Sequence, residues 1–261
     1  MQSSTFTNSL VAFNPLEQFQ IVPLISLNVG AVDISFTNSA LAAVGASTFF
    51  ILLARLVFHT GQGSIVPSRW QSLLEMIYDV VAGVLNDNVG QRGQAFFPFV
   101  FSLFAFLLVV NLIGMVPYSF TITSHLIVTL MFSLMVYLGV MTIMIREHGF
   151  HALSVFLPAG APFALYPLLI AIELISNVMR VISLSVRLFA NMMAGHILLK
   201  VLLGFAWTMM MAGGVIFFLH LIPMGVVFVL LFLETAVAVI QAYVFATLTC
   251  IYLNDALNLH H

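Results

Sequence analysis

The sequence predicts an all-α membrane protein with about five membrane-embedded helices and one amphipathic helix at the membrane interface. Hydrophobic residues make up 62% of the 261 residues and charged residues only 6%, and the mean hydropathy is +1.16. So few charges cannot cover the surface of a water-soluble domain of this length. The formal net charge of -2 comes from sparse and nearly balanced charges, so no nucleic-acid-binding patch is predicted.

The first half of the chain contains three apolar runs and one two-sided segment. Residues 41–56, 95–114 and 125–145 each approach the roughly 17 to 25 residues that cross a bilayer. A short turn with Pro117 separates the last two runs, which predicts a hairpin of two spans. Residues 67–88 carry Glu75 and Asp79 on one side and apolar residues on another, a pattern typical of an interfacial amphipathic helix.

The last hundred residues contain two much longer apolar runs, residues 163–203 and 205–253. Upright helices of this length would extend over roughly 60 to 75 Å, about twice the thickness of a bilayer core. Each run either folds back on itself or is strongly tilted. Gly213, Gly214 and Pro223 could bend the second run, but the first has no proline or glycine between Pro167 and Gly195 that could fold it back. We therefore expect two long, strongly tilted helices that form a hairpin at Gly204.

The sequence shows no internal repeat and no linker, so we expect one membrane domain over residues 1–261. Within it, residues 1–38 form an amino-terminal tail, 39–162 the peripheral helices and 163–258 the tilted hairpin. If the amphipathic helix stays in the interface, four arginines fall on one side of the membrane: Arg55, Arg69, Arg92 and Arg146. The positive-inside rule then predicts an outward amino terminus and an inward carboxyl terminus. No signal or transit peptide is recognisable.

Ionisable groups within the two long helices are the strongest functional signal, because each costs about 2.5 to 3.5 kcal/mol in a span. At 100° per residue, one stripe of the first helix gathers polar side chains: Glu173, Ser176, Asn177, Arg180, Ser183, Arg187 and Asn191. A stripe of the second helix gathers Glu234, Gln241, Tyr252 and Asp255.

These two stripes have a structural alternative, in which Glu173 pairs with Arg180 and the other polar groups bond across helices. Arg187 does not fit that alternative, because no acid lies three or four residues away and a guanidinium keeps its proton. Its partner must therefore come from elsewhere.

The remaining histidines and the single cysteine give weaker evidence of function. His125, His148 and His151 lack the acidic or cysteine companions of a metal site, so we expect interfacial positions for them. The apolar neighbours of Cys250 favour packing in the core. No GxxxxGK[ST] loop is present, so neither nucleotide phosphates nor a cofactor are expected to bind.

Three stretches carry a resemblance to a known family: SLSVRLFANMMAGH (residues 183–196), FLETAVAVIQAYVFATLTCIYLNDA (residues 232–256) and NLIGMVPYSF (residues 111–120). They closely resemble the a subunit of F-type ATP synthases, and the match extends over nearly the whole chain from about Leu41 onward. The pairing of His196 with Glu234 looks like the mitochondrial arrangement. The carboxyl end NDALNLHH resembles plant or algal forms.

The resemblance implies a role for each matching residue. Arg187 would face the carboxylate of a rotating c-ring, with Gln241 opposite it on the partner helix. Glu234 and His196 would line the inlet half-channel, Glu173 and Asp255 the outlet half-channel, while Asn191 and Asn111 would contribute polar lining. An imidazole and carboxylate relay favours protons over Na⁺.

The resemblance also implies the wider setting. The chain would translocate protons in the membrane sector of an ATP synthase, without enzymatic activity of its own, and so couple the proton-motive force to c-ring rotation and ATP synthesis. Its partners would be the c-ring, the peripheral stalk, other membrane-sector subunits and lipid. It would span the mitochondrial inner membrane, with the amino terminus in the intermembrane space and the carboxyl terminus in the matrix.

Two other classes remain as alternatives. A proton-coupled secondary transporter would use the charged stripes to bind a solute, but such proteins usually show repeated halves and broken helices. A structural membrane scaffold would leave Arg187 unexplained.

Overall fold

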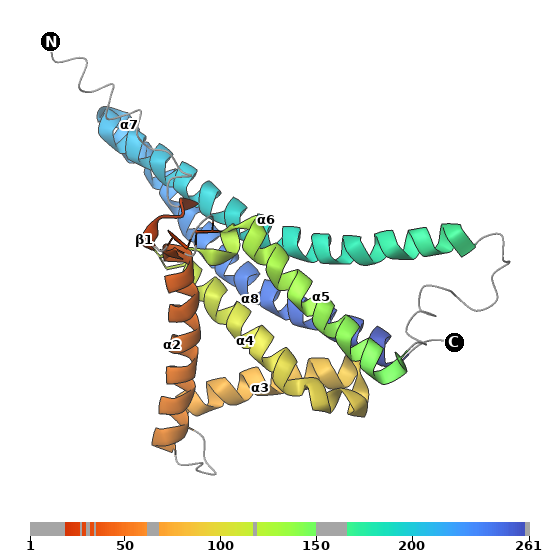
Figure 1. Cartoon of the computed structure of the whole chain (residues 1–261). Coiled ribbons are helices and arrows are strands. Elements are labelled where there is room, and N and C mark those ends of the chain that lie inside the picture. Colours follow the sequence, from red (N-terminus) through yellow and green to blue (C-terminus); the bar gives the residue numbers. More distant parts are fainter. Residues whose placement is uncertain are drawn as a thin grey trace.

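The computed structural model describes residues 19–26, 28–29, 32–33, 35–61, 68–116, 119–149 and 166–258, and helices dominate it (Figure 1). The helices are α2 (Asn38–Gly61), α3 (Arg69–Asn88), α4 (Phe97–Gly114), α5 (Leu126–His148), α6 (Tyr166–Ala212), α7 (Gly214–Leu219) and α8 (Leu221–Leu257). Five of them, α2, α4, α5, α6 and α8, are long and apolar enough to cross a membrane. The predicted fold class is therefore confirmed.

Two short antiparallel strand pairs precede α2, in the tail for which the sequence predicted no regular element. β1 (Pro23–Ile25) pairs with β4 (Phe36–Thr37), and β2 (Asn28–Val29) pairs with β3 (Val32–Asp33). The side chain of Asn38 holds this segment to the start of α2. Its Nδ2 donates to the carbonyl of Gln20 at 3.1 Å, and its Oδ1 accepts from the backbone N–H of Val22 at 3.3 Å.

The α3 helix has the two-sided character that its sequence predicts. Ser68 caps its first turn, since the Ser68 side chain accepts from the backbone N–H of Gln71. Leu74 and Val81 are buried, whereas Glu75 and Asp79 are exposed. One face of α3 therefore joins the core, and the acids stay on the opposite face.

The core lies around α8, which packs against α3, α4, α5 and α6. Phe245 of α8 is completely buried among Leu188 of α6, Val100 of α4 and Val81 of α3 in one hydrophobic cluster. Cys250 is also fully buried and belongs to the same cluster, so the prediction that it packs in the core is confirmed. Because four helices meet on α8, polar groups on this helix have neighbours on several sides.

The prediction of a turn at Gly204 is wrong, because α6 continues through that residue to Ala212. A single glycine inside a helix costs only about 1 kcal/mol, which a helix of 47 residues tolerates. The chain reverses instead at Gly213 and Gly214, whose φ angles of 69° and 62° end the helix. The short helix α7 then leads into α8, and Figure 1 shows it at the far end of the hairpin.

The lengths of α6 and α8 agree with the predicted tilt. They contain 47 and 37 residues, which extend about 70 Å and 55 Å at 1.5 Å per residue, against a bilayer core of about 30 Å. In Figure 1 the first half of α6 also runs nearly across the direction of α2. Parallel helices would appear parallel in any view, so these two cannot share one upright orientation.

Some predicted features lie outside the described residues. They are residues 1–18 of the tail, Pro67, Pro117, His151, the first residues of the helix predicted from residue 163, and the last residues of the carboxyl end, 259–261.

Candidate functional site

Arg187 lies near the middle of α6 with its side chain exposed. Leu184 and Leu188, on either side of it in sequence, are buried in the core, so the helix is anchored while the arginine faces away from it. The two ion pairs found among the described residues join other side chains. Within that part of the chain, Arg187 therefore has no carboxylate partner.

A polar contact joins α6 and α8 one turn after Arg187. The Asn191 Nδ2 donates to the Gln241 Oε1 at 2.9 Å, and Gln241 is only 3% exposed. Close by on α8, the carbonyl of Ala238 accepts from the Nδ2 of Asn111, a completely buried residue of α4, at 3.3 Å. The other amide atoms, Gln241 Nε2 and Asn111 Oδ1, contact no hydrogen-bonding partner among the described residues. This part of the core is therefore polar but incompletely paired.

The His196–Glu234 pair lies further along the hairpin, towards α7. The His196 Nδ1 and the Glu234 Oε1 are 3.9 Å apart, which is longer than a direct hydrogen bond. Glu234 is only 6% exposed, and no described residue donates a hydrogen bond to either of its carboxylate oxygens. A buried carboxyl with free acceptor positions is able to take up and release a proton.

Gly195 allows α6 and α8 to approach closely at this pair. A Cβ atom at position 195 would lie 2.6 Å from the Glu234 Oε1 and 2.8 Å from its Cδ. Any larger residue would therefore displace the carboxyl group. The sequence does not indicate this role, because a glycine within a helix gives no signal of what lies against it.

His196 has two further neighbours outside the hairpin. The Thr121 Oγ1 lies 3.2 Å from the His196 Nε2, and Thr121 is only 4% exposed. The ring of Phe19 meets the imidazole edge-on, with 6.4 Å between ring centroids. The imidazole is thus enclosed on three sides, by α8, by the segment between α4 and α5, and by the amino-terminal segment.

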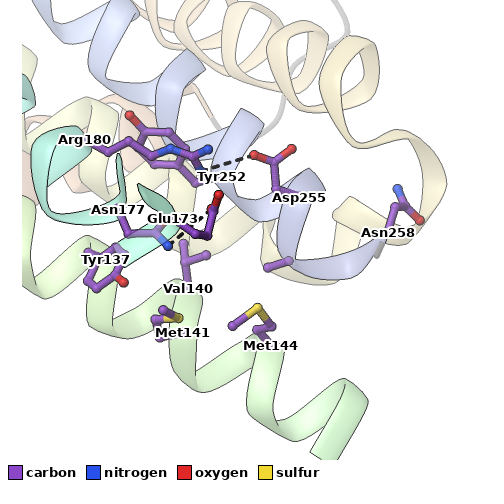
Figure 2. Close-up of a pocket in the computed structure, with 11 residues that line it drawn as sticks. Tyr137, Val140, Met141, Met144, Glu173, Asn177, Arg180, Tyr252, Asp255 and Asn258 are labelled. Carbon is purple, nitrogen blue, oxygen red and sulfur yellow. Dashed lines mark hydrogen bonds and ion pairs between the residues drawn. The ribbon is translucent and has the colours of Figure 1, made fainter. Parts of the chain in front are cut away.

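A second polar group surrounds Arg180, at the opposite end of the hairpin (Figure 2). Arg180 and Asp255 form an ion pair at 3.5 Å, and the guanidinium carbon lies 5.5 Å from the centre of the Tyr252 ring. Asn177 donates to the Glu173 Oε1 at 3.5 Å. These side chains, together with Tyr137 of α5, line a pocket of about 220 Å³, which we name the Arg180 pocket.

The Arg180 pocket decides one question that the sequence left open. Arg180 pairs with Asp255 on α8, whereas the structural alternative paired it with Glu173. Arg180, Asn177 and Tyr252 stood in the predicted polar stripes but were not proposed as site residues. Tyr137 was missed, because nothing in the sequence of α5 shows that this side chain faces Arg180.

The two polar groups lie on opposite sides of Arg187. Arg180 and His196 are 16 residues apart, or about 24 Å along α6. His196 lies at the end of the bundle where α4 ends and α5 begins, beside the short 3₁₀ helix η3 (Ile122–Ser124). The Arg180 pocket lies at the end where α5 stops, and there the His148 Nε2 contacts the carbonyl of Ala256 at 3.1 Å.

Metal binding finds no support among the described residues, where no three His, Cys, Asp or Glu side chains come together. The ring of His125 stacks on Phe120, with 5.3 Å between centroids, and burial lowers the pKa of His125. His148 contacts a backbone carbonyl. The eight site residues predicted from the sequence therefore divide into four places: Arg187 alone, the amide contacts of Asn111, Asn191 and Gln241, the His196–Glu234 pair, and the Arg180 pocket with Glu173 and Asp255.

Comparison with known proteins agrees with this architecture. Residues 40–254 match the family described as "ATP synthase A chain". An ATP synthase subunit a of Pylaiella littoralis is 51% identical over 95% of this chain and 99% of its own length. The corresponding protein of Brassica napus is 48% identical over 96% and 98%, and that of Rhodospirillum rubrum is 48% identical over 95% and 99%. The chain belongs to the ATP synthase A chain family.

Proposed function

We propose that this chain conducts protons through two offset half-channels in the membrane sector of an ATP synthase, and that this flow drives rotation of a c-ring. One observation carries the proposal. An exposed arginine without a carboxylate partner in the described chain, Arg187, lies between two separate polar groups that contain acids. A partner carboxyl at Arg187 would connect these two groups, because Arg187 lies between them along α6.

A rotating carboxyl group gives Arg187 its role. Such a group must be neutral while it passes through lipid and must ionise once in each rotation. A cation within a few Å favours the ionised form of a carboxyl by about 1 to 3 pKa units. Because a guanidinium keeps its proton, Arg187 would release the proton of the ring carboxyl without passing it across.

The inlet half-channel would contain the His196–Glu234 pair. An imidazole and a carboxylate both exchange protons near neutral pH when they are partly desolvated. The free oxygens of Glu234 and the enclosed position of His196 fit a relay better than a structural ion pair. Asn111, Asn191 and Gln241 would continue the polar lining from this pair towards Arg187.

The outlet half-channel would be the Arg180 pocket, with Glu173 and Asp255 as its acids. The pocket opens beside the end of α5, which carries Arg146. Basic residues mark the inward side under the positive-inside rule, so protons would leave there. In a mitochondrial inner membrane this side is the matrix, and the amino terminus would lie in the intermembrane space.

The proposed partners follow from the same arrangement. The exposed face of α6 around Arg187 would meet the c-ring, whereas α2 to α5 would be the peripheral helices that meet the stalk and other membrane-sector subunits. The chain itself would bind no nucleotide and perform no enzymatic step. Residues 163–258 would form the tilted hairpin that faces the rotor.

A Glu234→Gln substitution in the assembled ATP synthase tests the proposal. Glutamine keeps the size of the side chain but cannot release a proton, so proton flux through the reconstituted complex should fall by at least about tenfold. Glu75→Gln is the matched control, since Glu75 is exposed on α3 and hydrogen-bonds Gln71. Normal proton flux in an assembled Glu234→Gln complex would remove Glu234 from the path.

A further inference from the structure

The imidazole of His196 has two nitrogens in different surroundings. Its Nδ1 faces the Glu234 Oε1 at 3.9 Å, and its Nε2 faces the Thr121 Oγ1 at 3.2 Å. In a neutral imidazole only one nitrogen carries the hydrogen, and its hydrogen-bond partner selects which one. The direction of the Thr121 hydroxyl therefore decides which nitrogen exchanges protons.

The carbonyl of Gly114 offers the Thr121 hydroxyl an acceptor other than His196. A hydroxyl has a single hydrogen to donate, and the Thr121 Oγ1 donates to the carbonyl of Gly114 at 3.5 Å. A carbonyl accepts only. If the hydrogen of Thr121 is directed at Gly114, the Thr121 oxygen accepts the Nε2–H of His196 at 3.2 Å.

Close packing holds this geometry in place. A Cβ atom at Gly114 would lie 2.9 Å from the Thr121 Cγ2, so the end of α4 and Thr121 are in tight contact. The η3 segment that follows Thr121 packs against α6, and Phe19 contacts the imidazole edge-on. Thr121 is therefore held between α4 and His196 with little freedom to rotate.

We propose that Thr121 is a positioning residue of the proton path, which holds the hydrogen on Nε2 of His196 and leaves Nδ1 as the nitrogen that exchanges protons with Glu234. This inference rests on the proposed function. In the transfer, the Nδ1–H bond of an imidazolium breaks and an O–H bond of Glu234 forms, so the imidazole and the carboxyl both become neutral. One bound water, or a shift of about 1 Å, would complete the 3.9 Å contact. Besides Glu234, the charged group that acts on His196 is Lys200, one turn later on α6.

The first test compares Thr121→Val with Thr121→Ser in the assembled, reconstituted ATP synthase. Valine keeps the methyl group beside Gly114 but removes the hydroxyl, so proton flux should fall about fivefold, as expected for one lost hydrogen bond. Serine keeps the hydroxyl and should preserve flux within about twofold of the original. Thr129→Val is the matched control, because Thr129 is equally buried and its hydroxyl donates to Leu126 within its own helix.

The second test needs no change at Thr121. Nitrogen-15 NMR of histidine-labelled complex, with a His196→Gln complex to identify the signal, reports which nitrogen carries the hydrogen in neutral His196. We expect Nε2–H in the original complex and its loss in Thr121→Val. A hydrogen on Nδ1 in the original complex would overturn the inference, even if the valine variant failed to assemble.

The results separate the two proposals. Undiminished flux in Thr121→Val, or an equal loss in Thr121→Ser, would overturn the role of Thr121 while Glu234→Gln still blocks flux. If the Glu234→Gln complex conducts protons normally, the proposed path is wrong, and the role inferred for Thr121 is then wrong as well.

Discussion

The His196–Glu234 pair and the Arg180 pocket use the same kinds of residue in opposite ways. The carboxyl of Glu234 is buried, and no described residue donates a hydrogen bond to it. The carboxyl of Asp255 is half exposed, at 50%, and is paired with a guanidinium. Glu234 is thus buried without a hydrogen-bond donor, whereas Asp255 is half exposed and paired with a cation.

This difference has a physical consequence for proton exchange. Burial without a compensating partner strongly disfavours a carboxylate, whereas a neighbouring cation and access to solvent both favour it. The buried carboxyl of Glu234 should therefore control the passage of protons at the His196–Glu234 pair. In the Arg180 pocket, several polar groups and the open volume are available to carry protons. The loss of one of these groups should therefore reduce proton flux less.

Arg187→Lys should have the largest effect, because it removes the element that separates the two regions. A lysine presents a single ammonium instead of a planar fork and is able to give up its proton. We expect ATP synthesis and ATP-driven proton pumping by the reconstituted complex to be abolished. Arg146→Lys, at the exposed end of α5, is the control and should pump normally. Pumping that persists in Arg187→Lys would contradict the proposed role.

Gly195→Ala should have the next largest effect and acts on the enclosed region alone. The new Cβ would lie 2.6 Å from the Glu234 Oε1, so the carboxyl must leave its present position opposite His196. We expect proton flux to fall by about tenfold, since displacement of a reacting group by 1 Å costs up to about a hundredfold. Gly83→Ala controls for the higher helix propensity of alanine, because a Cβ at Gly83 meets nothing within 4 Å. Unchanged proton flux in Gly195→Ala would show that proton transfer does not depend on the position of the Glu234 carboxyl.

Asp255→Asn should have the smallest effect, and this result would sharpen the contrast between the regions. Exposed ion pairs contribute only about 0 to 1 kcal/mol, and Glu173 remains in the pocket as a second acid. We expect proton flux to fall by no more than about threefold. A loss as large as that of Glu234→Gln would show that the Arg180 pocket is as dependent on one residue as the enclosed region.

The sequence predicted most of the fold, because each span is a long apolar run whose length a bilayer determines. It misplaced the final turn at the single Gly204, although the Gly213–Gly214 pair that ends the helix is the stronger turn signal. The strands before α2 were missed because they are two or three residues long and depend on contacts with Asn38.

The site was less predictable than the fold. Helical periodicity placed Glu173, Arg187 and Asn191 on one stripe, because that stripe is a property of a single helix. It could not pair Arg180 with Asp255, or His196 with Thr121, since these contacts join segments 75 residues apart in sequence. Gly195 and Tyr137 gave no signal, because their roles depend entirely on what packs against them.

The most direct test of the central claim is a structure of the intact ATP synthase that resolves the surroundings of Arg187. We expect a carboxylate of a c-ring subunit within about 4 to 6 Å of the Arg187 guanidinium. An Arg187 paired with an acid of its own chain, or facing lipid with no rotor beside it, would rule out the proposed role.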